Sequence, residues 1–320
     1  MHFPVKAGGF LNPRTNLVRA VDGVSFEVNK GEAFGLVGES GCGKTTIGRC
    51  ILKLEQPTAG KILFDGTEIS TLPKDALHQY RRQVQAVFQD PFSSLNPRMS
   101  VEEIVGEPLL VHAVCPRAEI PGRVKALLSM CGLPGRVQDR YPHEMSGGQR
   151  QRVGIARALA LNPDFLVCDE AVSALDVSIQ AQIIRLLEDL REELGLTYLF
   201  IAHDLSVVRH ICDRVAVMYL GKIVEVGESE SLFADPLHPY TQGLLDAVPV
   251  PDPVIERERH FKLITGEIPS PMNPPSGCAF HPRCYKAQAA CSSAAPQMEP
   301  HGKGGRMVAC PFAASVQEAA

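Results

Sequence analysis

Short apolar runs alternate with longer amphipathic stretches along most of this sequence. "EAFGLVG" leads into "GKTTIGRCILKL", "DFLVCDE" is followed by "QAQIIRLLEDLREEL", and "TYLFIAH" is followed by "DLSVVRHICD". The first member of each pair has the near-continuous apolar character of a buried strand, and the second has the pattern of a helix. Buried strands joined by helices in this way predict a parallel sheet in an α/β fold.

The alternation stops between Gln89 and about Pro142, and this stretch is predicted to be an inserted α-helical subdomain. "VAVMYLGKIVEVGE" predicts a hairpin with Gly221 in its turn. After about Pro236, prolines cluster in "PLHPY", "VPVPDP" and "PSPMNPPSG", and a tail with cysteines follows. The predicted organisation is a first core part, a helical subdomain, a second core part that starts with the helix after "MSGGQ", and an extension rich in proline and cysteine, at residues 1–88, 89–142, 143–235 and 236–320.

The composition of the 320-residue chain is that of an ordinary globular protein, with 45 % apolar and 21 % charged residues. The net charge of −4 gives no reason to expect a nucleic-acid partner. No apolar run approaches the roughly 18 residues of a transmembrane helix, and the start "MHFPVKAGG" lacks the layout of a secretory signal. A cytosolic location is therefore expected, where the ten cysteines would be reduced thiols or metal ligands.

The stretch "GESGCGKT" matches the phosphate-binding pattern G-x-x-x-x-G-K-[ST] in every fixed position. In such a loop the glycines let backbone amides wrap phosphates, the lysine reaches the β and γ oxygens, and the hydroxyl can hold Mg²⁺. The loop stands between a predicted strand and a predicted helix, which makes a chance glycine turn the weaker interpretation. The predicted nucleotide-binding residues are Gly38, Glu39, Ser40, Gly41, Cys42, Gly43, Lys44, Thr45 and Thr46.

A second candidate element is "FLVCDE", an apolar strand that ends in two acids. Such an ending is common and would carry little weight alone, but the carboxyl ends of strands are where α/β sheets bind ligands. Paired with the loop at Gly38, Asp169 is predicted to hold the Mg²⁺ ion together with Thr45, and Glu170 is predicted to polarise the attacking water.

The third element is the stretch "MSGGQRQRVGIARAL", in which a small turn is followed directly by a helix rich in arginine. Free backbone amides and a positive dipole end make such a helix start an anion site. The chain therefore carries two predicted phosphate-binding elements, the loop at Gly38 and the turn at Ser146.

"MSGGQ", the Gly38 loop and "CDEAVSALD" together resemble the ATP-binding subunit of an ABC transporter, from about Val18 to Gly227. The resemblance implies a RecA-like P-loop ATPase core and two subunits arranged head to tail. Each ATP would then lie between the Gly38-type loop of one subunit and the SGGQ turn of the other, which explains the second element. The residues of the turn implied to contact the partner's nucleotide are Ser146, Gly147, Gly148 and Gln149.

The same resemblance implies roles for three further positions. Gln89 in "AVFQDP" would contact Mg²⁺ or the attacking water, and His203 in "FIAHDL" would contact the γ-phosphate. Asp176, in the segment Ser173–Asp176, would meet the partner subunit near its nucleotide. Met145 and Ala171 depart from the leucine and the proline that the family usually has at these places.

The segments "QDPFSSLNPRMSV", "VRAVDGVSFEV" and "PLHPYTQGLLDAVPVPDP" resemble the dipeptide and oligopeptide importer subfamily, in particular the second ATPase of a heterodimeric pair. This implies ATP hydrolysis that powers peptide import, with a second ATPase subunit, two membrane permeases and an extracytoplasmic solute-binding protein as partners. The chain would lie at the cytoplasmic face of the inner membrane. Nickel or glutathione uptake, a non-transport ABC ATPase and a cassette that binds ATP without hydrolysis are the alternatives.

Four cysteines in the tail, Cys278, Cys284, Cys291 and Cys310, are spaced C-x5-C-x6-C-x18-C. The spacing alone favours free thiols, because structural zinc usually uses a closer pair and the common ferredoxin run is absent. The whole tail, however, resembles the cysteine-bearing end of peptide-importer ATPases, which implies a [4Fe-4S] cluster, with zinc and free thiols as alternatives.

The tail is remote from the Gly38 loop in sequence, so ATP binding is expected to be independent of it. The remaining cysteines are predicted to be structural: Cys42, Cys50, Cys115, Cys131, Cys168 and Cys212.

Overall fold

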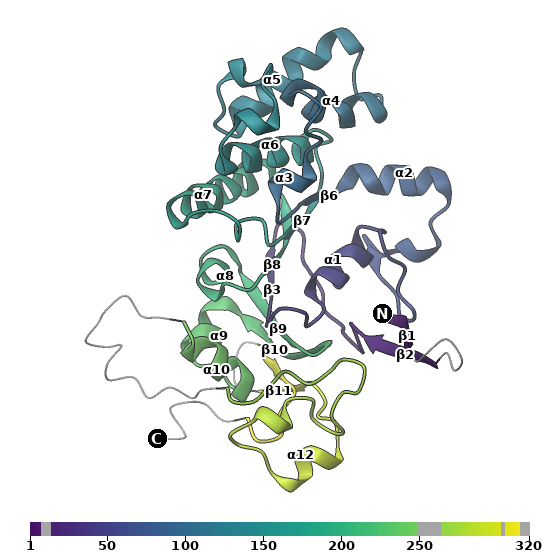
Figure 1. The fold of residues 1–320 in the computed structure, drawn as a ribbon, viewed down its shortest axis with the longest axis vertical. Coiled ribbons are helices and arrows are strands. Elements are labelled where there is room, and N and C mark those ends of the chain that lie inside the picture. The colour runs from purple at the N-terminus through teal and green to yellow at the C-terminus, as the bar shows by residue number, and fades with distance from the viewer. Residues whose placement is uncertain (8–13, 249–263, 302–304, 314–320) are drawn as a thin grey trace, which may run out of the picture.

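The computed structural model describes residues 1–7, 14–248, 264–301 and 305–313, so most of the "VPVPDP" cluster lies outside the described residues. Its centre is an eight-stranded sheet with the order β11-β12-β10-β9-β3-β8-β7-β6 (Figure 1). Neighbouring strands from β9 to β6 run parallel. At the other end of the sheet, β10 is antiparallel to β9, β12 to β10 and β11 to β12. The strands are β3 Ala33–Val37, β6 Val84–Val87, β7 Phe165–Asp169, β8 Thr197–Ala202, β9 Arg214–Tyr219, β10 Lys222–Glu228, β11 Glu299–Pro300 and β12 Met307–Val308.

The central strands are buried on both faces, which is why they are apolar without alternation. Phe34 and Leu36 of β3 belong to one core cluster, and Ala33 and Val37 of the same strand belong to another. Helix α1 (Lys44–Ile51) lies on the first side, and α7 (Val177–Leu194) and α8 (Leu205–Ile211) lie on the other. The predicted α/β core is confirmed.

A group of helices follows the strand β6 and forms one end of the molecule (Figure 1). It contains α3 (Pro91–Ser94), α4 (Val101–Val111) and α5 (Ile120–Met130), and it packs on α6 (Gly147–Leu159). Ser100 and Glu103 form a capping box that fixes the start of α4. The break in the strand–helix alternation after Gln89 therefore marks a helical insertion, as the sequence predicted.

The C-terminal extension is joined to the central sheet. β9 and β10 form the antiparallel hairpin predicted around Gly221, and β12 and β11 continue the sheet beyond β10. After β10 the chain forms α9 (Ser229–Ala234), and the extension contains α10 (Pro239–Asp246), the 3-10 turn η5 (His281–Arg283) and α12 (Ala289–Ser293). Arg306 crosses from the tail to the buried carboxylate of Glu225 in β10 at 2.7 Å, which ties the extension to the core.

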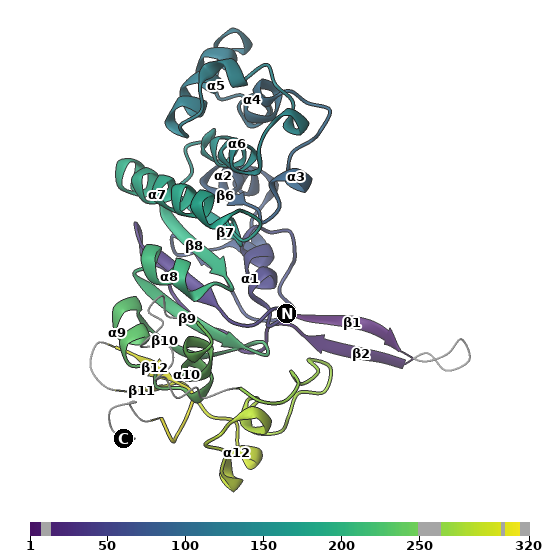
Figure 2. The same cartoon turned by 60° about the vertical axis from the view of Figure 1, so that its left-hand side comes forward.

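The first strands, β1 (His2–Ala7) and β2 (Arg14–Arg19), form a hairpin that projects from the sheet body (Figure 2). A short β4–β5 pair (Leu63–Phe64 and Thr67–Glu68), the 3-10 turn η1 (Ile69–Thr71) and α2 (Lys74–Gln83) fill the segment before β6. Three more 3-10 turns lie in or next to the helical insertion: η2 (Arg117–Glu119), η3 (Gly135–Val137) and η4 (Pro142–Glu144). Among the described residues, none of the helices has the length and apolar character needed to span a membrane.

Candidate nucleotide site and cysteine pocket

Four parallel strands bring residues of the predicted nucleotide site to one edge of the sheet. Gly38 follows β3, Gln89 comes two residues after β6, Asp169 ends β7, and His203 follows β8. Because these strands are parallel neighbours, their carboxyl ends meet at the same edge, which is the ligand-binding edge of open α/β sheets. Residues spread over 165 positions (203 − 38) are thereby gathered around the start of α1.

The phosphate-binding loop is closely enclosed by its neighbours at two glycines. Gly38 has φ 150°, and a Cβ at this position would stand 2.1 Å from the carbonyl oxygen of Met218 in β9. Gly43 has φ 109°, and a Cβ there would stand 2.0 Å from the carbonyl oxygen of Ala20. Both positions require glycine, because backbone atoms of other segments occupy the space of a side chain.

The loop also fixes the side chains of Lys44 and Thr45, which the sequence predicts to contact phosphate and Mg²⁺. Lys44 is buried, and its ammonium donates hydrogen bonds to the carbonyl oxygens of Gly38 at 2.7 Å and Glu39 at 3.1 Å. The hydroxyl of Thr45 donates to Oδ1 of Asp169 at 3.1 Å. A hydroxyl and a carboxylate within contact distance are oxygen ligands of the kind that Mg²⁺ uses, so the donor set fits this ion.

The two acids of β7 differ in their surroundings. Burial raises the pKa of Asp169, although the hydrogen bond from Thr45 opposes the shift. Glu170 lies beyond the strand with φ 49°, and its backbone N–H donates to the carbonyl of Ile201 at 2.8 Å. Its Oε2 accepts a hydrogen bond from Gln89 at 2.6 Å and lies 3.5 Å from Nδ1 of His203. The structure therefore brings the three predicted catalytic residues into one cluster.

The other predicted loop residues have varied environments. Ser40 and Gly41 are exposed, and Thr46 is half-buried. The thiol of Cys42 is buried 3.8 Å from the Lys44 ammonium, and burial raises its pKa.

The SGGQ turn is the start of helix α6 and is closed by its own side chains. The Ser146 hydroxyl accepts from the Gln149 N–H at 3.3 Å, and Oε1 of Gln149 accepts from the Ser146 N–H at 3.1 Å. Ser146 is exposed, whereas a Cβ on Gly148 would come within 2.6 Å of Ile179 in α7. The glycine thus allows α6 and α7 to pack closely while the serine faces outward.

The segment Ser173–Asp176 lies next to this turn. Leu175 is the neighbour that a Cβ on Gly147 would meet, at 3.3 Å. The hydroxyl of Ser173 donates to the carbonyl of Glu170 at 3.0 Å, and the exposed Asp176 is the N-cap residue of α7. Within the described part of the chain, no hydrogen bond joins Ser146–Gln149 to Gly38–Thr45, so the two phosphate-binding elements predicted from sequence are not brought together in one chain.

The phosphate-binding loop does contact the C-terminal extension. Arg283 donates two hydrogen bonds to the carboxylate of Glu39, at 2.7 and 2.9 Å, across 244 positions of sequence. The Glu39 N–H donates to the hydroxyl of Tyr240 in α10 at 2.9 Å. The tail is remote from the loop in sequence but not in space, because the sheet carries the tail back to the edge where the loop lies. Sequence reasoning missed both contacts, which no motif marks.

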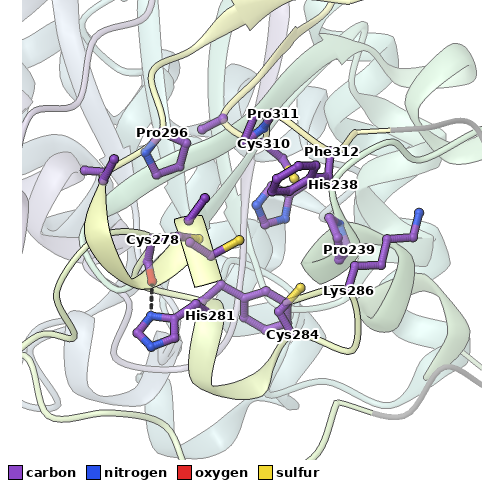
Figure 3. A pocket seen from close by; sticks show the side chains of 16 residues that line it. His238, Pro239, Cys278, His281, Cys284, Lys286, Pro296, Cys310, Pro311 and Phe312 are labelled. Carbon is purple, nitrogen blue, oxygen red and sulfur yellow. Dashed lines mark hydrogen bonds between the residues drawn. The ribbon is translucent and has the colours of Figure 1, made fainter. Parts of the chain in front are cut away.

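The four tail cysteines line one pocket of about 130 Å³. Figure 3 shows Cys278, Cys284 and Cys310 around the cavity, with the His281 ring held at 2.9 Å from the Cys278 carbonyl oxygen. Cys291 lines the same pocket, and its carbonyl accepts the Cys278 N–H at 2.8 Å. Burial raises the pKa of Cys278 and Cys310, and that of Cys284 to about 11.

These thiols share a cavity without forming a compact single-ion site. Among the described residues, no group of three or more His, Cys, Asp or Glu side chains is placed to hold one metal ion. The donor set is nevertheless soft and uniform, and it fits a larger thiolate-bound group better than a hard cation. The other six cysteines are free and lie outside this pocket, five of them buried and Cys115 half-buried.

Comparison with known proteins gives two family matches on this chain. Residues 21–173 match the ABC transporter family, and residues 224–291 match the oligopeptide/dipeptide transporter C-terminal region. The oligopeptide transport ATP-binding protein AppF of Bacillus subtilis is 53% identical over 299 residues, which cover 93% of this chain and 91% of AppF. YkfD of the same organism is 53% identical over 295 residues, covering 92% of this chain and 89% of YkfD.

Two solved structures share the fold. The ATP-binding cassette MJ0796, solved as a dimer in a post-hydrolysis state with ADP and Pi, matches with a TM-score of 0.60 at 30% identity, over 71% of this chain and 96% of that chain. The cbiO1 protein of Clostridium perfringens, part of an ABC transporter complex, matches with a TM-score of 0.61 at 32% identity, over 67% of this chain and 84% of that chain. This chain belongs to the ABC transporter ATP-binding proteins, in the branch that carries the oligopeptide/dipeptide transporter C-terminal region.

Proposed function

We propose that this chain binds and hydrolyses ATP and thereby powers the import of di- or oligopeptides through separate membrane permeases. One observation carries the proposal: a phosphate-binding loop with its adjacent acids is followed, in the same chain, by the C-terminal region of oligopeptide and dipeptide transporters. Relatives that match along nine-tenths of this chain are named for oligopeptide transport, which supports peptides over other solutes.

Each residue of the site has a proposed task. The loop Gly38–Thr46 wraps the phosphates, and Lys44 turns from its loop carbonyls to the β and γ oxygens. Thr45, Asp169 and Gln89 would hold Mg²⁺, which when bound offsets phosphate charge. Glu170 orients and polarises the attacking water, with Gln89 and His203 fixing its carboxylate from two sides. His203 then contacts the γ-phosphate.

The SGGQ turn is proposed to serve a nucleotide held by a second, homologous ATPase subunit. Its exposed serine and its lack of hydrogen bonds to the chain's own described loop support this assignment. Asp176 lies beside the turn and would face the same partner. A heterodimeric partner is proposed from the resemblance of the sequence to the second ATPase of an importer pair.

The wider assembly follows from the same proposal. Residues 1–88 and 143–235 form the two parts of the ATPase core. Residues 89–142 form the helical subdomain that receives the permease, and residues 236–320 form the extension. The chain would lie at the cytoplasmic face of the membrane as a peripheral subunit, and an extracytoplasmic binding protein would deliver peptide to two permease subunits.

For the cysteine pocket we propose a [4Fe-4S] cluster held by Cys278, Cys284, Cys291 and Cys310. Support comes from four soft ligands around one cavity and from the resemblance of the tail to peptide-importer ATPases. Protein purified without oxygen should be brown and contain about four irons per chain. Colourless protein with about one zinc, or with four freely alkylated thiols, would contradict the cluster.

The transport function is tested by reconstitution of the chain with its permeases and second ATPase in liposomes. Peptide uptake should require ATP on the side of the liposome membrane that carries this subunit. Peptide-loaded binding protein should stimulate ATP hydrolysis. A transporter carrying Lys44→Ala in this chain is the control for nucleotide binding. Peptide uptake that persists without ATP would refute ATP-driven import, and hydrolysis that responds to nickel and not to peptides would refute the peptide assignment.

A further inference from the structure

The contact between Arg283 and Glu39 joins two parts of the molecule that have separate proposed tasks. Glu39 is the second residue of the phosphate-binding loop, and it is the only acid in "GESGCGKT". Arg283 is buried and lies in η5, directly before Cys284 of the cysteine pocket. The two hydrogen bonds, 2.7 and 2.9 Å long, have the parallel fork geometry that makes Arg–carboxylate pairs strong and directional.

The charge of Glu39 is unfavourable for the task of the loop. A carboxylate in a loop that binds triphosphate repels the ligand, and this repulsion is strongest where water is excluded. The guanidinium of Arg283 cancels that charge at a distance of one hydrogen bond. With the pair intact, the remaining local charge of the loop is the ammonium of Lys44.

The backbone at Glu39 is held by the same part of the extension. Its N–H donates to the hydroxyl of Tyr240 at 2.9 Å, and its carbonyl accepts from Lys44 at 3.1 Å. Tyr240 packs in a buried aromatic group with Tyr219 and Phe280, with tilted rings at centre distances of 4.7 and 5.3 Å. Phe280 lies between Cys278 and Cys284 in sequence and lines the cysteine pocket, so the pocket wall and the loop support share side chains.

We propose that Arg283 is a positioning residue for ATP: it neutralises Glu39, fixes the phosphate-binding loop and couples nucleotide affinity to the integrity of the cysteine tail. The proposal rests on the proposed function, because it requires that ATP binds at this loop. By linkage the coupling is reciprocal, so nucleotide at the loop also stabilises the arrangement of the tail.

A double-mutant cycle on the full-length chain tests the charge argument. The affinity for a fluorescent methylanthraniloyl derivative of ATP is measured with Mg²⁺ for wild type, Arg283→Gln, Glu39→Gln and the double variant. Arg283→Gln should weaken binding about tenfold, since it leaves the carboxylate unpaired beside the phosphates. Glu39→Gln leaves the guanidinium of Arg283 unpaired beside the phosphates and should bind at least as tightly as wild type. The double variant, in which neither charge remains, should bind nearly as well as wild type.

The matched control is Arg214→Gln. Arg214 pairs with Glu32 at 3.0 Å, at the opposite end of β3 from the loop, so its loss removes an Arg–Glu pair without touching the nucleotide site. It should leave the affinity for the ATP derivative unchanged. Unchanged affinity in Arg283→Gln, or a double variant as weak as Arg283→Gln, would overturn the proposal. Failure of the wild-type chain to bind the ATP derivative would instead refute the proposed function.

Two further variants keep the test sharp if Arg283→Gln does not fold. Arg283→Lys retains the charge without the fork and should recover most of the affinity. Tyr240→Phe removes only the hydroxyl that accepts the Glu39 N–H and should weaken binding about threefold, as loss of one hydrogen bond does. In the assembled transporter the Arg283 variants should raise KM for ATP with kcat at saturating ATP nearly unchanged. Wild-type affinity in Tyr240→Phe, or a loss of kcat equal to the loss of kcat/KM in the Arg283 variants, would contradict a positioning role.

Discussion

The phosphate-binding loop and the SGGQ turn are both glycine-rich starts of helices, yet the chain supports them in opposite ways. The loop is enclosed by the carbonyls of Met218 and Ala20, and its second residue is held by Tyr240 and Arg283. The turn is closed mainly by its own capping box, and Ser146 is exposed. The loop is supported by other segments of the chain, whereas the turn is supported by its own residues and leaves Ser146 exposed.

This difference predicts whether each element functions in the isolated chain or only in the assembled complex. A preorganised loop binds its ligand without assembly, because the cost of ordering it is met during folding. Under the proposed function, the outward-facing turn would contribute only when a second subunit brings a nucleotide to it. Variants of the loop should therefore change ATP binding in the isolated chain, and variants of the turn should change ATP turnover only in the assembly.

The largest expected effect is on the chemical step at the loop side. Glu170→Gln should lower ATP turnover about a thousandfold in the assembled transporter, because it removes the carboxylate that polarises water. ATP should still bind, since Lys44 and the loop are untouched. Phosphate release measures the rate, and Glu193→Gln on the exposed end of α7 is the control. Near-normal hydrolysis would contradict the role of Glu170, provided that the partner's site is inactivated in the same complex.

The second effect separates the two elements directly. The isolated chain should hydrolyse ATP at least about tenfold more slowly than the complex with its partner ATPase and permeases, because half of each site is missing. Ser146→Arg should impair turnover of the nucleotide on the partner and leave ATP affinity of the isolated chain unchanged. Full activity of a dilute monomer, or loss of ATP binding in isolated Ser146→Arg, would break the comparison.

Sequence predicted the parts that rest on local pattern and strand direction. The loop and the acids at the end of β7 could be placed because parallel strands end at one edge. The helix after "MSGGQ" followed from its local pattern, and Gln89 and His203 followed from the family resemblance. The Arg283–Glu39 pair could not be predicted, because one arginine among 32 basic residues carries no signal of which carboxylate it will meet. The sequence shows only that Arg283 lies between two cysteines of the tail. The contact with Glu39 depends on the sheet, which continues through β12 and brings the tail to the loop.

A third prediction concerns the coupling between the cysteine pocket and ATP binding at the loop. Cys284→Ser should remove bound iron and loosen the tail, and it should also weaken ATP affinity about fivefold, since Arg283 is the preceding residue. Iron content and binding of a fluorescent ATP derivative are measured on the same anaerobic sample. Cys115→Ser, outside the pocket, is the control. If iron is lost while ATP affinity stays at the wild-type value, tail and loop are not coupled.

The fourth effect is on the stability of the turn. Ser146→Ala removes the hydroxyl that accepts the Gln149 N–H and should lower the free energy of unfolding by about 1 kcal/mol, the usual cost of losing an N-cap. Thermal or urea unfolding of the isolated chain measures this change. Ser206→Ala tests specificity, because Ser206 lies in the first turn of α8, where Asp204 is the capping residue. An equal loss in both variants would mean that the hydroxyl of Ser146 has no special part in the turn.

The smallest expected effect is a gain in stability, and it concerns Asp169 on the loop side. Burial raises the pKa of Asp169 in the folded chain, so its protonated form favours folding, and this stabilisation is lost as pH rises through the folded-state pKa. Asp169→Asn mimics the protonated form. Without nucleotide and Mg²⁺ it should therefore raise Tm at pH 7 by about 2 °C or less, and the gain should vanish near about pH 3, where the wild-type carboxyl is itself protonated. Thermal unfolding across this pH range provides the measurement. A lower Tm for Asp169→Asn at pH 7 would show that the hydrogen bond from Thr45 stabilises the ionised carboxylate more than burial destabilises it. The loop side would then be stabilised by its own hydrogen bonds, as the turn is.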